Sequence, residues 1–266
     1  MTNQANNQSV KLPVVSTILG PLALTFSGGF GALLLCLAFS LIITAIMGTT
    51  GNLTSCIAET FRTKYYCTNN LLWFFAARIL VFAVNVIFIR NWVNILDGQK
   101  LNWRQVFVPT MRDVKTGGII LGFLATLGVA LFSLYLLYIR QPNPNWRIEI
   151  IYFGIVSLGF LVPILALRFL GYVTMAALGE SLTSFKIIWQ KTTGNMFVIL
   201  SSAFVIFIIM MIILINFLQF AHNAASISNL GQAWLTEFIC SFAKIVSLIL
   251  FTNFCYVLNK NLSERK

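Results

Sequence analysis

Four residues with charged or amide side chains interrupt long apolar runs of this chain, and together they have the chemistry of an anion site. Arg78 and Lys244 each lie within such a run, Glu237 lies seven positions before Lys244 on the same helical face, and Asn216 lies in a further run. Two cations at a similar depth could hold an anionic group such as a lipid phosphate, with Glu237 tuning the charge. The alternative is that both cations snorkel to an interface and Lys244 makes a structural contact with Glu237.

Proton transfer is the other chemistry that the sequence offers. Glu237, His222 or Glu180 would be the proton-transfer group of a membrane-embedded enzyme acting on lipid headgroups. However, the chain has one histidine and seven acidic residues, and it contains no metal-protease, nucleophile-elbow or phosphate-loop motif. We therefore expect no catalytic residue, no cofactor and no metal ion. The lipid enzyme and a scaffold subunit of a membrane complex stay open as alternatives.

The elements that must position these residues are helices that cross a membrane. Of 266 residues, 58% are hydrophobic and only 9% are charged, which is too little polar surface for a water-soluble globule. About 20 apolar residues cross the roughly 30 Å of hydrocarbon as a helix. Long runs such as 198–218 do not alternate apolar and polar residues, so a β-barrel is excluded. Six spans are predicted, at residues 28–47, 71–89, 117–139, 150–170, 196–220 and 235–258.

A recurring pattern groups the six spans into three tandem hairpins. Each hairpin follows an amphipathic segment and a glycine-containing step, at Thr25–Gly29, Lys115–Gly118 and Thr192–Asn195. Apolar residues at helical spacing predict that each segment is a helix lying flat at the cytoplasmic surface, and glycine permits the change of direction. These residues are Val15, Ile18, Leu19 and Leu22, then Trp103, Val106, Phe107 and Met111, then Leu182, Phe185, Ile188 and Trp189. The predicted fold is an all-α, compact six-helix bundle; chance similarity of apolar segments is the alternative to a repeat.

The basic residues lie mainly on one side of the predicted spans and set their orientation. Five cations fall within residues 90–115, whereas the loop at 221–234 has none, and the positive-inside rule then places both termini in the cytoplasm. Residues 1–27 form a cytoplasmic segment, 28–258 the membrane domain and 259–266 a cytoplasmic tail. The net charge of +11 therefore indicates attraction to anionic lipid headgroups and not to nucleic acid. The sequence leaves a protein partner or homo-oligomer undetermined.

Two pairs of small residues have predicted structural roles. Cys56 and Cys67 lie in the first outward loop and could form a disulfide in an oxidising compartment, with two free thiols as the alternative. Gly118 and Gly122 give the third span a small-residue face, which predicts close packing against another helix. The cysteines within spans are expected to be apolar fillers, namely Cys36, Cys240 and Cys255.

Two stretches of the chain carry a resemblance to a known family. They are Leu167–Phe169 leading through Ala176–Glu180 to Phe185–Asn195, and Arg90–Trp92 leading through Leu96–Gly98 to Trp103. The pattern resembles the YciC-like family of six-span bacterial membrane proteins and the related membrane domain fused to glycerophosphodiester phosphodiesterases. The resemblance implies a location in the bacterial inner membrane and transfers no catalytic residues. We expect a non-enzymatic protein that contributes to envelope organisation, or to binding or transport of a small or lipidic anion.

Overall fold

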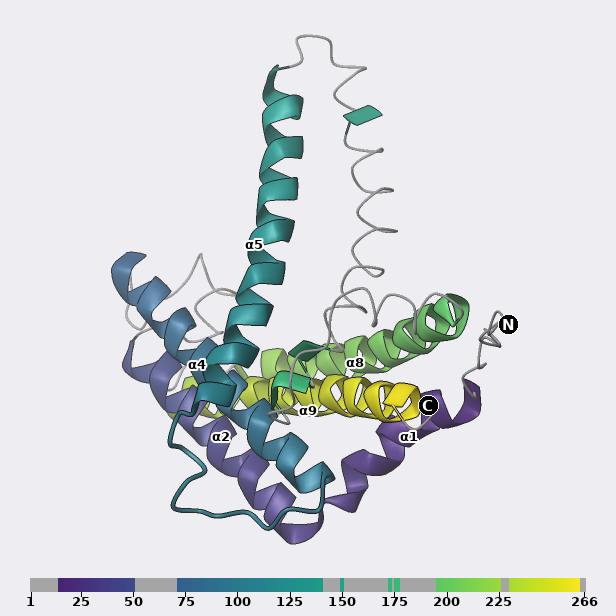
Figure 1. The fold of residues 1–266 in the computed structure, drawn as a ribbon. Helices are drawn as coiled ribbons and strands as arrows, with labels where there is room; N and C mark the ends of the chain where they lie inside the picture. Colours follow the sequence, from purple (N-terminus) through teal and green to yellow (C-terminus); the bar gives the residue numbers. More distant parts are fainter. Residues whose placement is uncertain are drawn as a thin grey trace, which may run out of the picture.

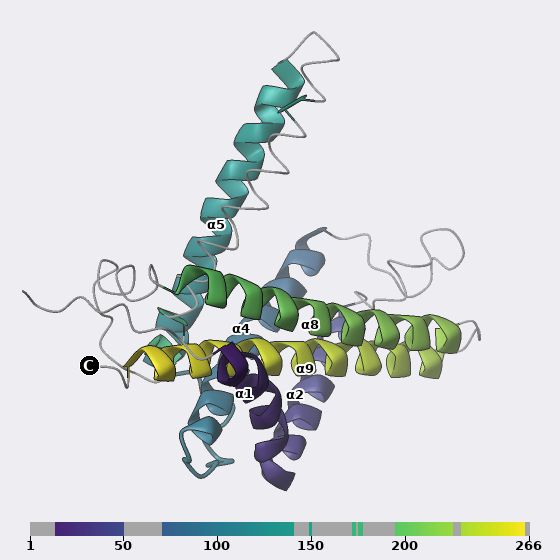
Figure 2. The same ribbon diagram turned by 90° about the vertical axis from the view of Figure 1, so that its right-hand side faces the viewer.

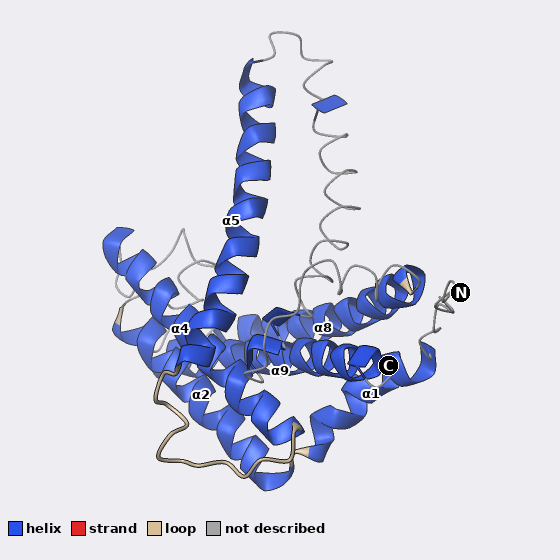
Figure 3. Cartoon of the chain, in the orientation of Figure 1, coloured by secondary structure: helices blue, strands red, loops and turns tan. Residues whose placement is uncertain are grey.

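The structure, a computed structural model, describes residues 14–50, 71–140, 149–150, 172–173, 175–177, 195–225 and 230–263. The described chain is helical, with turns and loops but no strand (Figures 1 and 3). Its long helices are α1 (Val14–Ser27), α2 (Gly29–Thr49), α4 (Leu71–Leu96), α5 (Met111–Arg140), α8 (Met196–Ala225) and α9 (Leu230–Ser263). Among these, α2, α4, α5, α8 and α9 are long and apolar enough to cross a membrane. The chain is an all-α integral membrane protein.

Five of the predicted spans coincide with these five helices. The helices run further than the predicted spans, since α4 continues to Leu96 and α9 to Ser263, within the predicted tail. The remaining predicted span, 150–170, lies outside the described residues apart from position 150. Six spans and the three-hairpin order therefore stay predictions.

The first glycine step changes the direction of the chain, as predicted. Helix α1 ends at Ser27 and α2 begins at Gly29, which has a φ of +62°. This left-handed backbone costs a residue with a Cβ atom about 1–2 kcal/mol, whereas glycine adopts it freely. Figure 1 shows α1 and α2 as two arms that meet at this step.

The second amphipathic segment is a loop, so the prediction of an interfacial helix there is wrong. Residues 101–110 form turns and irregular backbone, α5 begins at Met111, and Gly117 and Gly118 lie inside that helix with no hinge. Pro109 accounts for the difference, because proline lacks a backbone N–H and disfavours helix in the preceding residue. The third amphipathic segment lies outside the described residues, and only Asn195, immediately before α8, is described from its glycine step.

Helix α9 is the centre of the packing. It contacts α8, α2, α1 and α4. One apolar core joins α2, α4 and α9 through residues such as Phe39, Phe88 and Ile245, and a second joins α8 and α9 through Ile199 and Phe254. Figures 1 and 2 show α8 and α9 side by side and running in opposite directions.

The buried side chain of Asn253 on α9 forms hydrogen bonds to both α4 and α1. Asn253 accepts a hydrogen bond from Trp92 Nε1 of α4 at 2.7 Å. Its amide nitrogen donates to the Pro21 carbonyl oxygen and to Thr25 Oγ1 of α1, each at 3.0 Å. Asn253 is fully buried, so these bonds replace the water that its amide loses. The contact fixes the ends of α4 and α9 beside α1.

Helix α5 stands apart from the other described helices. Only its first turns pack on α4, where Asp113, Thr116 and Gly117 are buried, and no residue of α5 from Gly118 to Ile139 is buried within the described structure. Figures 1 and 2 show α5 projecting away from the other described helices. The described helices therefore do not form the predicted compact bundle. The physical reason is that lipid solvates apolar side chains as well as protein does, so hydropathy alone does not force α5 into a bundle.

Candidate anion-binding site

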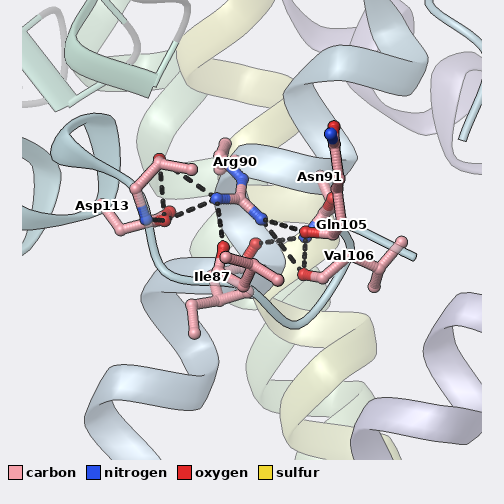
Figure 4. Close-up of polar contacts among 8 residues, drawn as sticks. Ile87, Arg90, Asn91, Gln105, Val106 and Asp113 are labelled. Carbon is pink, nitrogen blue, oxygen red and sulfur yellow. Dashed lines mark hydrogen bonds and ion pairs between the residues drawn. The ribbon is translucent and has the colours of Figure 1, made fainter. Parts of the chain in front are cut away.

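The side chain of Arg90 on α4 is held by the connection between α4 and α5 (Figure 4). Its terminal nitrogens donate hydrogen bonds to three backbone carbonyl oxygens, those of Gln105, Val106 and Val108, at 3.3, 3.1 and 2.9 Å. Nη1 also donates to Thr110 Oγ1 at 3.0 Å and forms a 2.6 Å ion pair with Asp113 Oδ2. Both charged side chains are about 95% buried, with 5% and 6% exposed. The positive charge of Arg90 is thus compensated by Asp113.

Asn91, the next residue, completes the attachment. Its Nδ2 donates to the Val106 carbonyl oxygen at 2.8 Å and to the Ile87 carbonyl oxygen of its own helix at 2.8 Å. Non-helical backbone beside membrane-crossing helices needs such donors, because lipid offers no hydrogen bonds. Arg90 and Asn91 therefore allow the α4–α5 connection to lie against the helices.

Asp113 also sets the start of α5. The backbone N–H and the hydroxyl group of Thr110 donate to Asp113 Oδ2 at 2.6 and 2.9 Å. This is a capping arrangement, in which an acid at the third helical position reaches back to the residue before the helix. The negative charge also suits the positive end of the helix dipole. One carboxylate oxygen consequently joins α4, the connection and α5.

A hollow of about 360 Å³ opens beside this attachment. This volume lies at the lower end of the roughly 300–1,000 Å³ of small-molecule sites. Ten residues line it: Arg90, Asn91, Asn94, Gln99, Lys100, Leu101, Asn102, Gln105, Thr110 and Arg112. The set contains cations, amides, a hydroxyl group and no carboxylate, so its chemistry fits an anion.

The positive charge of the hollow comes from Lys100 and Arg112. Both side chains are exposed, and neither forms an ion pair within the described part of the chain. Arg90 adds no net charge because Asp113 neutralises it. Uncompensated cations beside amide donors bind phosphate, sulfate or carboxylate groups through charge-assisted hydrogen bonds.

The structure brings together two of the four residues first considered for an anion site. Lys244 Nζ lies 3.7 Å from Glu237 Oε1, with the Glu237 side chain fully buried and the Lys244 side chain 42% exposed. Arg78 is half-buried on α4, and Asn216 on α8 donates to the Ile212 carbonyl oxygen of its own helix at 2.7 Å. None of the four lines the described hollow. An anion site built from them stays a prediction.

The structure describes some of the other residues that the sequence singled out, whereas the rest lie outside the described residues. His222 belongs to the last turns of α8, whereas Glu180 and the cysteines Cys56 and Cys67 lie outside the described residues. The cysteines within the helices are buried, as expected of apolar fillers: Cys36, Cys240 and Cys255.

The small-residue face of α5 has no partner helix in the described structure. A Cβ atom built at Gly118 or Gly122 meets no described atom within 4 Å, whereas one at Gly117 meets Phe82 and Val86 of α4 at 3.7 Å. Close packing at Gly118 and Gly122 stays a prediction. Gly117 is the glycine of this group that lies against α4.

Sequence reasoning missed the attachment of the connection to α4. It counted Arg90 and Arg112 as loop cations and gave Asp113 no role. The available signal was Pro109-Thr110 followed by Asp113, which marks a capped helix start.

Comparison with known proteins adds no family or relative. No family model matches the chain, and no curated protein and no solved structure matches it. Among the described residues no group of three or more His, Cys, Asp or Glu side chains could hold a metal ion.

Proposed function

We propose that this chain is a six-span, non-enzymatic protein of the bacterial inner membrane that binds an anionic group of a lipid or small solute at its cytoplasmic face. The observation that carries the proposal is a hollow in which, within the described part of the chain, Lys100 and Arg112 have no ion-pair partner and no carboxylate joins the lining. Such binding would serve envelope organisation or movement of an anion. The resemblance to YciC-like proteins supports the inner-membrane location.

The way α2 packs against α9 supports the proposal that both termini lie on the same side of the membrane. Gly28, before α2, has Trp92 near the end of α4 as a neighbour, and Trp92 bonds to Asn253 in the second half of α9. At the other end of α2, Gly48 lies against Trp234 near the start of α9. Thus α2 and α9 run in opposite directions, which supports an even number of spans with both termini on one side. The cations of 90–115 favour the cytoplasm for that side.

The cytoplasmic hollow is a better anion site than the residues near the opposite membrane face. Glu237 offsets the charge of Lys244 there, whereas nothing described offsets Lys100 and Arg112. Among the described residues that line the hollow there is also no histidine, carboxylate or cysteine that could transfer a proton or attack a substrate near neutral pH. Binding is therefore favoured over turnover.

The test removes two charges from the hollow and compares this with removing two charges beside it. The full-length protein is purified in mild detergent, and bound phosphatidylglycerol is measured by native mass spectrometry. We expect Lys100→Gln with Arg112→Gln to weaken binding by about tenfold or more, since charge-assisted hydrogen bonds contribute about 1.5–3 kcal/mol each. Arg104→Gln with Lys115→Gln is the matched control, because both residues are exposed and lie outside the lining. Equal losses in the two double variants would refute a built site.

A further inference from the structure

Large apolar side chains are exposed on the α4–α5 connection and at the start of α5, next in sequence to residues that line the hollow. Trp103 and Phe107 are each 45% exposed, Val108 is 52% exposed and Met111 is 77% exposed. All four fall within nine consecutive residues that also contain Arg104. Apolar side chains gathered in this way on a loop mark a surface that contacts a partner or a membrane.

The connection that carries these side chains lies back along the membrane-crossing helices. Leu101 is the nearest side chain to Gly31 of α2, and the Phe107 ring centroid lies 5.2 Å from that of Phe39. Phe39 is ten residues into α2, about 15 Å along its axis at 1.5 Å per residue. Figure 1 shows the connection returning beside α2 to the start of α5. The exposed side chains therefore stand at the level of the spans, where their surroundings are lipid.

Cations lie at both ends of this apolar stretch. Lys100 precedes it and Arg112 follows it, and both line the hollow. The combination matches the bilayer interface, where acyl chains meet apolar and aromatic side chains and phosphates meet Lys and Arg. A free anion arriving from the cytosol would gain nothing from an apolar rim.

We infer that residues 99–112 form a membrane-inserted rim through which the hollow takes the phosphate headgroup of an anionic phospholipid from the surrounding leaflet. This inference rests on the proposed anion binding, and it identifies the anion as the headgroup of a membrane phospholipid. Trp103 and Phe107 contact the acyl chains, and Lys100 and Arg112 bind the phosphate. Arg90 and Asn91 act as positioning residues, because their hydrogen bonds hold the rim against the helices.

The experiment separates the apolar rim from the charged hollow. Wild-type protein in mild detergent is titrated with phosphatidylglycerol, followed by native mass spectrometry, and separately with inorganic phosphate, followed by equilibrium dialysis. We expect Trp103→Ser with Phe107→Ser to weaken phosphatidylglycerol binding by about tenfold or more, because two large apolar contacts are lost. Phosphate binding should stay within about twofold, which also shows that the variant is folded. Leu124→Ser with Phe132→Ser, on the exposed side of α5, is the matched control and should change neither titration.

The outcomes separate the two proposals. Unchanged phosphatidylglycerol binding in the rim variant would overturn the membrane-inserted rim while leaving the anion site in place. Inorganic phosphate binding to the wild type as tightly as phosphatidylglycerol would overturn the lipid source. If Lys100→Gln with Arg112→Gln loses neither ligand, the anion site itself is absent and both proposals fall.

Discussion

At the scale of single residues, the side chain of Arg90 attaches the α4–α5 connection to α4. It pairs with the buried carboxylate of Asp113 and supplies hydrogen bonds to the backbone of the α4–α5 connection. The planar guanidinium group presents several donors in a fixed geometry, which an ammonium group cannot reproduce. The Val106 carbonyl oxygen also accepts from Asn91, and the Gln105 carbonyl oxygen also accepts from the Val108 N–H. The Val108 carbonyl oxygen depends on Arg90 within the described chain, and lipid would offer it no other donor. Arg90 thus makes irregular backbone tolerable beside the spans.

Replacing Arg90 with Met should lower the free energy of unfolding by about 3–5 kcal/mol, because Asp113 would keep a buried charge without its partner. The measurement is thermal unfolding in mild detergent, followed by circular dichroism. Adding Asp113→Asn should recover part of the loss by removing that charge. Arg104→Met is the control and should stay within about 0.5 kcal/mol of the wild type, since Arg104 is exposed. An Arg90→Met variant as stable as the wild type would show that the ion pair contributes nothing.

At the scale of elements, the packing of α2 on α9 depends on a glycine at the C-terminal end of α2. A Cβ atom at Gly48 would lie 2.3 Å from Cη2 of Trp234, well inside contact distance. The indole ring therefore occupies the space that any other side chain would need. This contact fixes one end of the α2–α9 pair.

Gly48→Leu should destabilise the protein by about 1–3 kcal/mol, since the added side chain overpacks the contact with Trp234. Combining it with Trp234→Ala should recover most of the loss, because leucine would then fill the vacated space. Gly128→Leu on α5 is the control, as a Cβ atom there meets no described atom within 4 Å. The comparison uses thermal unfolding of the three variants. Additive losses in the double variant would contradict the contact.

The α4–α5 connection illustrates what an apolar pattern fails to specify at this scale. Trp103, Val106, Phe107 and Met111 have helical spacing, yet only Met111 belongs to a helix. Val106 is buried among α2 and α4 while Trp103 and Phe107 are exposed, so burial follows the folded loop and not a helical face. Pro109 and the cap at Asp113 determine where the helix begins.

At the scale of the whole molecule, α9 organises the described helices and α5 extends away from them. The surface of α5 carries exposed apolar side chains such as Leu121, Val129 and Phe132. Exposure of such an apolar surface to water would be unfavourable, whereas the acyl chains of a bilayer solvate it. The arrangement therefore belongs to a membrane-embedded protein.

Cysteine labelling tests the proposed six-span topology. In a cysteine-free background, Ser9→Cys and Ser263→Cys should react with a membrane-impermeant maleimide only after the inner membrane is permeabilised, because both termini are cytoplasmic in the proposal. Ser228→Cys, in the loop without cations, is the control and should react in intact spheroplasts. The five described spans alone would separate the termini, so labelling of one terminus in intact spheroplasts would exclude six spans.

Five of the predicted spans, the glycine step at Gly29 and the burial of the cysteines within spans were predictable from the amino-acid sequence. Apolar runs of sufficient length predict helices in lipid because every backbone group must be satisfied within the segment. That argument located α2, α4, α5, α8 and α9. Gly29 was identified because a change of direction requires a backbone that glycine adopts freely.

Contacts between distant side chains became visible only in the folded chain. Arg90 and Asp113 are 23 residues apart, and Trp92 and Asn253 are 161 apart, so no local pattern links them. Hydropathy also cannot distinguish a helix face that meets protein from one that meets lipid, because both are apolar. For this reason the sequence predicted the spans, whereas the central position of α9, the separation of α5 and the charged hollow emerged only from the folded chain.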